Sequence, residues 1–247
     1  SAIINTQDPI VLELAKDFGG EIITYGAADA DLSAESVTHY ADGVGAVLLY
    51  KGSRHTLRMR VPGAHNVSNA MAALLAAQEA GVPIERGVEI LSRFEGIRRR
   101  MEVVGTKGGV TVMDDFAHNP DKIAATIAAL REFPGRLHIF FQPHGFGFLK
   151  LLGAELAQTF ADSLLPSDRL YLVEPLYLGG TVERTITSED VARMIRAHGG
   201  YAAVMKNRDG VYDAIIGEVR EGDRVIIMGA RDDTLSDFAR LILSQIP

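Results

Sequence analysis

Two acidic residues and a histidine make Asp114-Asp115-Phe116-Ala117-His118-Asn119-Pro120 the segment of the chain richest in candidate chemistry. Asn119 followed by Pro120 is typical of a helix cap and first helical position, whose free backbone amides favour an anion. A carboxylate there could accept two ribose hydroxyls, and His118 could contact a phosphate. A capped turn with solvated acids explains the same residues equally well, so the segment alone leaves both interpretations open.

Two other segments carry residues that could bind a ligand. Gly145 and Gly147 follow His144 in a loop whose backbone could approach a ligand closely, although such loops are often only turns. The run Arg231-Asp232-Asp233 could bind a charged substrate, but surface ion pairing explains it as well. Neither segment indicates a particular chemistry by itself.

His65, Asn66 and Asn69 lie where a long helix is expected to begin, and Asn66 could be its cap. Taken alone, these residues would be helix caps. The chain contains neither Gly-x-x-x-x-Gly-Lys-Ser/Thr nor Gly-x-Gly-x-x-Gly after a predicted strand, so no complete nucleotide-binding fingerprint is present. No metal ligands are predicted.

From Met101 onward, strands and helices are predicted to alternate. The expected strands are 101–104, 110–114, 137–141, 169–173, 201–204 and 224–228. The expected helices are 120–133, 148–163, 188–197, 211–219 and 234–244. This order is typical of a mainly parallel sheet covered by helices on both faces, in which ligands bind beyond the carboxyl ends of the strands. The loops that follow four strands therefore form the expected rim of a site: 114–120, 142–147, 174–181 and 229–233.

The first third of the chain is predicted to form a separate, smaller part. Its expected elements are a helix at 9–18, a strand at 21–25, a hairpin of strands 46–50 and 55–61, and helices at 66–80 and 83–94. The polar segment Glu95–Arg100 follows and contains a glycine. We therefore expect a domain boundary there, between residues 1–94 and 95–247.

Composition excludes several classes of protein. The 247 residues include 32 acids and 25 bases, and the acidic balance argues against nucleic acid as a partner, because binding its phosphates needs clustered cations. Only Arg98-Arg99-Arg100 forms a basic run. The absence of cysteine excludes disulfide and zinc-finger scaffolds. No apolar stretch approaches the roughly 20 residues of a membrane span, and no signal peptide is evident, so we expect no membrane partner and a cytoplasmic location.

Three motifs, read in order, resemble the Mur ligase family: Gly63-Ala64-His65-Asn66-Val67-Ser68-Asn69-Ala70, then Arg99-Arg100-Met101-Glu102, then the Asp114–Pro120 segment. Residues 5–9, 141–144 and 229–231 agree in order and spacing, so the resemblance covers essentially the whole chain. The most similar subgroup loads UDP-N-acetylmuramate with alanine or with a recycled peptide. The resemblance implies an α/β fold, in which a Rossmann-like, doubly wound, mainly parallel six-stranded C-terminal domain (95–247) follows the end of a central ATPase domain (1–94).

The family's activity is ADP-forming amide ligation by a protein of three domains. ATP phosphorylates a substrate carboxylate, an amine attacks the acyl phosphate, and an amide forms with loss of phosphate. The UDP-sugar domain, the phosphate loop and the region of the carbamylated lysine and magnesium ligands have no counterpart here, so we expect a fragment that is inactive alone. The implied cofactor is ATP, with Mg²⁺ in the complete enzyme, and the implied substrates are UDP-N-acetylmuramate and an amino acid or peptide.

The resemblance also implies roles for individual residues. Asn69 would contact the adenine with the support of Asn66, and Arg100 would reach the nucleotide from the inter-domain hinge. Asp115 would bind the ribose hydroxyls, and His118 matches a histidine near the reaction centre. These residue types suit their roles, because an amide offers both a donor and an acceptor, and a guanidinium matches phosphate geometry.

One departure from the family concerns the substrate. In the alanine-adding enzymes the loop after His144 carries arginines that hold the amino acid's carboxylate, whereas Gly145–Phe148 stands here. With His144 in the substrate site, Lys150 or Arg231 could replace that charge, or the acceptor could be larger, as in peptide recycling.

Two other functions remain alternatives at this point. The alternation of strands and helices also fits an NAD(P)-binding oxidoreductase, although the glycine fingerprint is missing. A non-catalytic module could bind a ligand at the glycine-lined rim.

Overall fold

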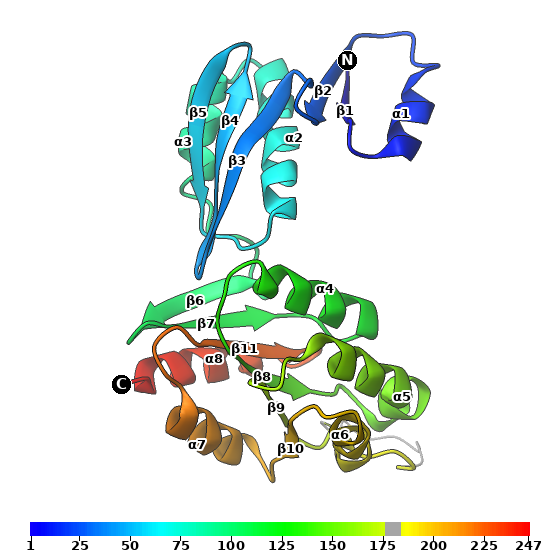
Figure 1. Cartoon of the computed structure of the whole chain (residues 1–247), viewed down its shortest axis with the longest axis vertical. Coiled ribbons are helices and arrows are strands. Elements are labelled where there is room, and N and C mark those ends of the chain that lie inside the picture. Colours follow the sequence, from blue (N-terminus) through cyan, green and yellow to red (C-terminus); the bar gives the residue numbers. More distant parts are fainter. Residues whose placement is uncertain (176–183) are drawn as a thin grey trace. The chain divides into compact units, whose positions relative to one another are not determined.

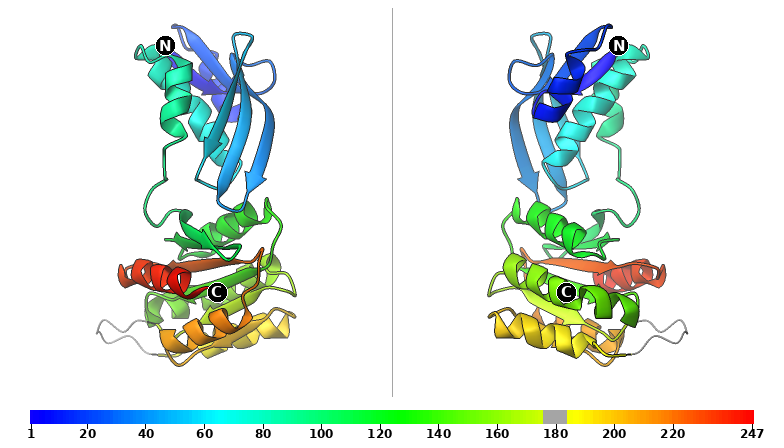
Figure 2. Two further views of the ribbon diagram at one scale, coloured as in Figure 1. Left: turned by 90° about the vertical axis from the view of Figure 1, so that its left-hand side faces the viewer. Right: turned by 90° about the vertical axis from the view of Figure 1, so that its right-hand side faces the viewer.

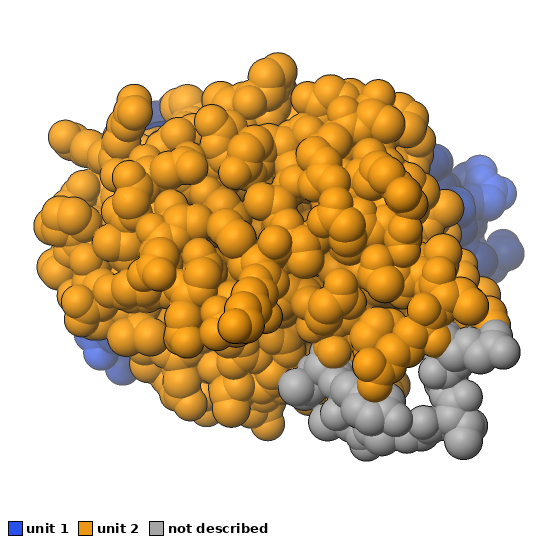
Figure 3. Space-filling view, turned by 90° about the horizontal axis from the view of Figure 1, so that it is seen from below, with its two compact units in different colours: residues 1–95 blue, residues 96–247 orange. Residues whose placement is uncertain are grey.

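The computed structural model describes residues 1–175 and 184–247, which form two compact units, Ser1–Glu95 and Gly96–Pro247 (Figures 1 and 3). Most of the predicted rim loop 174–181, from residue 176 onward and including Gly179 and Gly180, lies outside the described residues. Within the described ranges, no helix is both long and apolar enough to cross a bilayer.

The first unit contains a five-stranded sheet on which two helices pack (Figure 1). Its strands, in spatial order, are β1 (Ala2–Asn5), β2 (Ile22–Gly26), β3 (Leu32–Tyr40), β4 (Gly43–Tyr50) and β5 (Ser53–Met59). The first three pair in parallel, and β3, β4 and β5 pair antiparallel. The helices are α1 (Pro9–Ala15), α2 (His65–Glu79) and α3 (Ile84–Leu91). The predicted hairpin and all three predicted helices are confirmed.

Apolar stripes on α2 and α3 build the core of this unit. Buried residues recur along α2 at helical spacing, as Val67, Met71 and Leu74 illustrate, and α3 buries Ile84 and Val88. These side chains pack against buried residues of β3, β4 and β5. Burial of one stripe from each helix therefore fixes both helices on the sheet.

Three features of the first unit differ from the prediction. The strands β1 and β3 were not predicted. Most of β3 is polar and solvent-exposed, with burial only at Leu32 and Ser33, so it lacks the apolar alternation that marks a strand. Asn66 is not the helix cap, because α2 begins at His65 after Ala64. The side-chain amide of Asn66 instead donates to the backbone carbonyl of Pro62 at 2.7 Å.

The second unit is built on a six-stranded sheet, which confirms the predicted fold. In spatial order its strands are β10 (Ala202–Val204), β9 (Arg169–Leu172), β8 (Leu137–Gln142), β11 (Arg224–Gly229), β7 (Val110–Asp115) and β6 (Glu102–Lys107). All neighbours pair in parallel except β6 and β7, which are antiparallel. The central strands β7, β8 and β11 are buried along their whole length, as expected for strands covered on both faces.

Five described helices cover the two faces of this sheet (Figures 1 and 2). On one face lie α4 (Pro120–Arg131), α5 (Phe146–Ser163) and α6 (Ser188–Ala197). On the other lie α7 (Arg208–Glu218) and α8 (Thr234–Gln245). Asn119 caps α4 and Pro120 is its first residue, as predicted: the Asn119 side chain accepts from the Lys122 amide at 3.0 Å.

The strand order places a crevice at the carboxyl end of the sheet. Strand β11 lies between β7 and β8, and the chain leaves β11 for α8 on one face but leaves β7 and β8 for α4 and α5 on the other. Adjacent strands whose following helices lie on opposite faces mark the position where open α/β sheets bind ligands. The loops after β7, β8 and β11 all start there.

Candidate functional site

The consecutive carboxylates Asp114 and Asp115 end β7 and lie on opposite faces of the sheet. Asp114 accepts a hydrogen bond from the Ser236 hydroxyl on α8 at 2.6 Å. Asp115 accepts one from the Thr126 hydroxyl on α4. Successive side chains of a strand alternate between faces, which explains the division. The two carboxylates therefore have separate surroundings.

A turn that carries Arg100 is held against the end of β7. The amide of Arg100 donates to the carbonyl of Ile97 at 3.0 Å and closes the turn. On one side of Arg100, the Arg99 carbonyl accepts from the Phe116 amide at 2.7 Å. On the other side, the Met101 amide donates to Asp115 Oδ1 at 3.4 Å.

Both residues that flank Arg100 are left-handed, with φ of 58° at Arg99 and 49° at Met101. Non-glycine residues rarely adopt this region, at a cost of about 1–3 kcal/mol each. The turn persists because the hydrogen bonds to the β7 end hold it.

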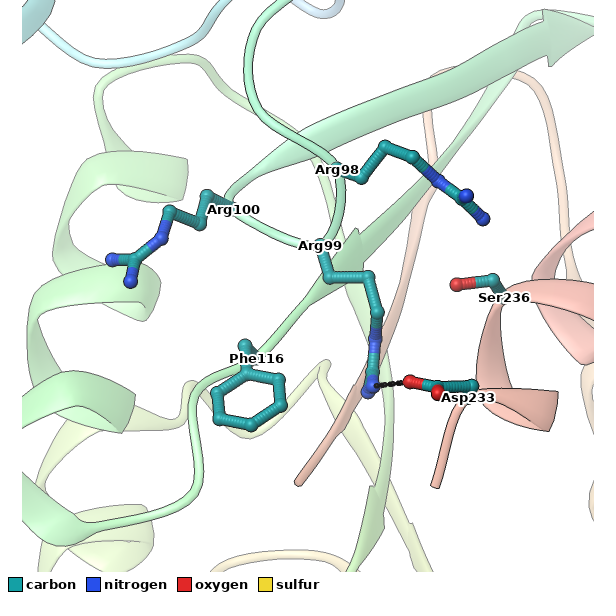
Figure 4. A pocket seen from close by; sticks show the side chains of 6 residues that line it. All are labelled: Arg98, Arg99, Arg100, Phe116, Asp233 and Ser236. Carbon is teal, nitrogen blue, oxygen red and sulfur yellow. Dashed lines mark ion pairs between the residues drawn. The ribbon is translucent and has the colours of Figure 1, made fainter. Parts of the chain in front are cut away.

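Arg99 is only 8 % exposed, and its guanidinium lies beneath this turn (Figure 4). One terminal nitrogen donates to the carbonyl of Gly229 at 2.7 Å. Nε lies 3.5 Å from Asp114 Oδ1, and the other terminal nitrogen lies 3.5 Å from Asp233 Oδ1. The guanidinium also lies 5.1 Å from the centre of the Phe116 ring. Arg99 thus joins the ends of β7 and β11 to the start of α8.

A pocket of about 470 Å³ opens at this place, lined by Arg98, Arg99, Arg100, Phe116, Asp233 and Ser236 (Figure 4). Arg98 and Arg100 are exposed and extend from the turn in opposite directions (Figure 4). Within the described part of the chain, no hydrogen bond or ion pair engages either side chain. Arg100, which sequence reasoning singled out, is therefore available to an anion, whereas the buried Arg99 is not.

Burial dominates the electrostatics of the two carboxylates. It raises the pKa of Asp114, an effect opposed by the Ser236 hydrogen bond and by Arg99. It likewise raises the pKa of Asp115, opposed by the Thr126 hydrogen bond and the Met101 amide. Desolvation thus perturbs both carboxylates, and Asp114 contacts Arg99 and Ser236, which line the pocket. Perturbed ionisable residues are frequent at functional sites.

The structure brings His118 and His144 together beyond the ends of β7 and β8. Their rings meet edge to face with centroids 5.5 Å apart, and the Phe148 ring lies 4.4 Å from that of His144. Burial lowers the pKa of His144, and nearby His118 and Arg231 lower it further. Lys150 is exposed in the first turns of α5. His118, His144 and Arg231 therefore share one region.

His118 has a defined tautomer. Its Nδ1 lies 2.9 Å from the carbonyl oxygen of Phe116. A carbonyl only accepts, so Nδ1 carries the proton and, in the neutral ring, Nε2 is the acceptor.

Asp232 belongs to a closed polar network rather than to a unit with Arg231. It accepts from the Gln142 amide at 2.8 Å and from the Thr234 hydroxyl at 2.6 Å, and it pairs with Arg208. Burial alone would raise its pKa, but the hydrogen bonds from Thr234 and Gln142, together with Arg208, lower it. The network ties the ends of β8 and β11 to the start of α7.

Asn66 and Asn69 lie on the first turns of α2 in the first unit. The side-chain amide nitrogen of Asn69 donates to Asn66 Oδ1 at 3.2 Å. Asn69 is exposed and Asn66 is partly buried. Asn66 thus fixes the amide orientation of Asn69.

Sequence reasoning missed Arg99, Ser236 and Arg208 as residues that build the site. The alternation of side chains along β7 could have assigned Asp114 and Asp115 to different faces. No comparable signal links Arg99 to Gly229, because the contact is made only by the tertiary fold. In the described ranges, no cluster of three or more His, Asp or Glu residues is arranged to hold a metal ion.

Comparisons with known proteins confirm the resemblance. Two family models match: the Mur ligase middle domain over residues 1–77, and the Mur ligase glutamate ligase domain over residues 99–231. A UDP-N-acetylmuramate--L-alanine ligase from Lachnospira eligens is 35% identical over 237 residues, which cover 93% of this chain and 50% of that protein. The chain spans about half the length of the curated relatives it matches.

Solved structures agree with the fold. A murein peptide ligase from Psychrobacter arcticus is 26% identical with a TM-score of 0.54, over 99% of this chain and 50% of that one. A MurF ligase from Thermotoga maritima, solved in complex with ADP, is 17% identical with a TM-score of 0.63, over 98% and 52%. With more than half of its length matched by one family model, this chain belongs to the Mur ligase family.

Proposed function

We propose that this chain is part of an ATP-dependent, ADP-forming amide ligase that joins UDP-N-acetylmuramate to an amino acid or peptide in peptidoglycan precursor synthesis or recycling. Residues 1–94 would be the end of the central domain and 95–247 the C-terminal domain. Family membership, the activity named for the Lachnospira eligens relative and the ADP bound by the Thermotoga maritima MurF ligase support this function. The single observation that carries it is Arg100, which is exposed, has no side-chain partner among the described residues, and precedes Met101, whose amide donates to Asp115.

The residues at this crevice fit a nucleotide. Asp115 is only 7 % exposed and accepts hydrogen bonds from the Thr126 hydroxyl and the Met101 amide, with the Phe116 amide also close to it. Because a carboxylate can accept about four hydrogen bonds, part of this capacity would remain for a ribose hydroxyl. Arg100 offers a guanidinium that no described side chain engages, and guanidinium suits phosphate. In the first unit, taken by itself, Asn69 keeps its side-chain carbonyl and one amide hydrogen, which suit an adenine edge, and Asn66 fixes their orientation. ATP, when bound, supplies the phosphoryl group that activates the substrate carboxylate.

His118 is the proposed catalytic residue. An amine becomes nucleophilic only after it loses its proton, and a neutral imidazole can accept that proton. The Phe116 carbonyl holds the His118 ring so that Nε2 is the free acceptor. His118 would thus act as the base for the incoming amine.

His144, Lys150 and Arg231 form the proposed acceptor site. Because burial and its neighbours lower the pKa of His144, that ring is neutral and hydrogen-bonding near neutral pH. Lys150 and Arg231 are exposed cations that suit a carboxylate on the acceptor. The Phe148 ring, tilted against that of His144, adds apolar surface, which suits a larger acceptor as well as an amino acid.

The test uses a protein in which the coding sequence that precedes this chain is joined to it. ADP release is measured with ATP, UDP-N-acetylmuramate and either L-alanine or a short cell-wall peptide. We expect ADP release to require the UDP-sugar and one of the acceptors. Tight nucleotide binding without turnover would favour the non-catalytic module, and tighter binding of NAD than of ATP would favour the oxidoreductase. Either outcome would overturn the proposed ligase function.

A further inference from the structure

We propose that Arg99 is a positioning residue: its buried guanidinium holds the turn of residues 97–101 against three elements of the second unit and so fixes Arg100 relative to Asp115. This inference rests on the proposed function, which assigns Arg100 and Asp115 to the nucleotide. Arg99 itself would not touch the nucleotide.

Arg100 is exposed, whereas Arg99 is only 8 % exposed. Nε of Arg99 and the terminal nitrogen that faces Asp233 are both buried and form no hydrogen bond with the protein. Neither atom is open to a ligand from solvent. An effect of Arg99 on nucleotide binding must therefore pass through the residues that it holds.

Arg99 contacts three elements of the second unit. Its side chain spans from Asp114 on β7 to the Gly229 carbonyl at the end of β11 and to Asp233 at the start of α8. Gly229 cannot shift easily, because even a Cβ at this position would lie 3.0 Å from the Gln142 carbonyl and 2.8 Å from Leu235. The guanidinium thus has a rigid acceptor on one side and a buried carboxylate on the other.

Backbone hydrogen bonds on both sides of Arg100 connect its position to that of Arg99. The Arg99 carbonyl accepts from the Phe116 amide, and the Met101 amide donates to Asp115, so both neighbours of Arg100 are tied to the end of β7. The same two neighbours have left-handed backbone conformations that side chains disfavour. A turn of this kind relaxes when its contacts are removed. Loss of the Arg99 side-chain contacts would therefore release both ties and let Arg100 move away from Asp115.

The geometry requires arginine rather than another cation. Three oxygens surround one planar guanidinium, one of them hydrogen-bonded and two at ion-pair distances of 3.5 Å. A lysine ammonium, a point charge on a flexible stem, reproduces only part of this arrangement. Arg99→Lys keeps the charge and removes the planar group. The double substitution Arg99→Met with Asp114→Asn removes the buried charge pair together, which avoids leaving one unpaired charge in the interior. It provides a folded alternative if Arg99→Lys is unstable.

A matched control lies at the other end of the same sheet. Arg136, before β8, pairs with Asp223, before β11, and also donates to the Glu218 carbonyl at 2.6 Å. Arg136→Lys therefore weakens a comparable arginine network in the same unit without touching the turn of residues 97–101. If an arginine substitution destabilises the second unit as a whole, amide hydrogen exchange should become faster in Arg136→Lys as well.

The first measurement needs only this chain. Amide hydrogen exchange is followed at Met101 and Phe116, whose amides are bonded to the turn. We expect exchange at both to be about tenfold faster in each Arg99 variant, which corresponds to about 1.4 kcal/mol of lost protection, and unchanged in Arg136→Lys. Wild-type exchange rates in the Arg99 variants would overturn the inference, because the turn would then hold without the guanidinium.

The second measurement uses the joined protein described above. We expect the Arg99 variants to raise KM for ATP about tenfold with kcat changed by less than about twofold, because the lost positioning weakens nucleotide binding uniformly. Faster exchange with an unchanged KM would overturn the positioning role while leaving the ligase function intact. If the wild-type joined protein neither binds nor uses ATP, the proposed function fails, and the exchange measurement still decides whether Arg99 holds the turn.

Discussion

Asp114 and Asp115 are neighbours in sequence, yet their carboxylates accept hydrogen bonds from helices on opposite faces of the sheet, from Ser236 on α8 and Thr126 on α4 respectively. One carboxylate can therefore serve the structure while the other serves a ligand. Asp114 pairs with the buried Arg99, and Asp115 lies next to the turn that presents Arg100.

Asp114→Asn should destabilise the second unit. The substitution leaves the Arg99 guanidinium, which is buried, without its buried counter-charge, and we expect the free energy of unfolding to fall by about 2–3 kcal/mol. Asp233→Asn is the control, because Asp233 faces the same guanidinium from a fully exposed position. Urea unfolding of both variants at pH 7 tests this. Equal stability of the two variants would show that the Asp114 ion pair contributes nothing.

Stability should fall as the pH drops below about 6.5, the usual pKa of histidine. His138 is fully buried, and burial followed by the nearby Arg136 lowers its pKa. Below pH 6.5 the unfolded chain binds a proton at His138 that the folded chain does not. This proton binding stabilises the unfolded state, so the free energy of unfolding falls. The lowered pKa of His144 acts in the same direction. His138→Phe should flatten the pH dependence of the free energy of unfolding between pH 5 and about 6.5.

Asp223 should produce a separate loss of stability at lower pH. Burial would raise its pKa, but Arg136 and the Arg220 amide lower it overall. A carboxyl with a lowered folded pKa stabilises the protein above its unfolded pKa, and this stabilisation disappears below about pH 4. Urea midpoints across pH 3–7 measure both effects. A plot of the urea midpoint against pH that shows no inflection near pH 6 would contradict the assignment to His138.

Gly229→Ala should be destabilising although it adds one methyl group. The φ of Gly229 is 153°, and the new Cβ would lie 2.8 Å from Leu235 and 3.0 Å from the Gln142 carbonyl. We expect a loss of about 1–3 kcal/mol in the free energy of unfolding. Gly217→Ala on α7 meets no atom within 4 Å and should stabilise by about 0.5–1 kcal/mol. Thermal unfolding compares the two, and a stabilised Gly229→Ala would refute the close approach.

Arg231→Met and Lys150→Met should affect the acceptor rather than the nucleotide. Both residues are exposed cations at the proposed acceptor site. Loss of one charge pair with a carboxylate should raise KM for the acceptor about tenfold and leave KM for ATP unchanged. Steady-state kinetics of the joined protein tests this. A rise in KM for ATP alone would contradict this prediction and would assign both residues to the nucleotide site instead.

Much of the fold was predictable because burial marks it in the sequence. β8 and β11 are buried along their whole length and contain the apolar runs Ile139–Phe141 and Val225–Met228. Asn119-Pro120 marks the start of α4. β3 was not predictable, because all but its first two residues are at least partly exposed and it is held mainly by pairing with β4. Ladder hydrogen bonds leave no compositional trace.

The candidate site was predictable only in part. Asp115 and Arg100 stand in recognisable motifs, but Arg99 acts through Gly229, which is 130 residues away, and a contact of that range leaves no local pattern. The helix-cap prediction for Asn66 was wrong because its amide is drawn to the Pro62 carbonyl. Local chemistry indicated the residue types, and tertiary contacts assigned their partners.

The most direct test of the central claim is calorimetric titration of ADP into the joined protein, with wild-type Asp115 and with Asp115→Ala. The account predicts that the wild type binds ADP and that the variant binds it about tenfold more weakly, since Asp115 would hold the ribose. Arg136→Lys, which alters the ion pair with Asp223 at the opposite end of the same sheet, provides the comparison for any loss of folded protein. Equal ADP affinity of wild type and Asp115→Ala would contradict the claim that Arg100 and Asp115 form the nucleotide site.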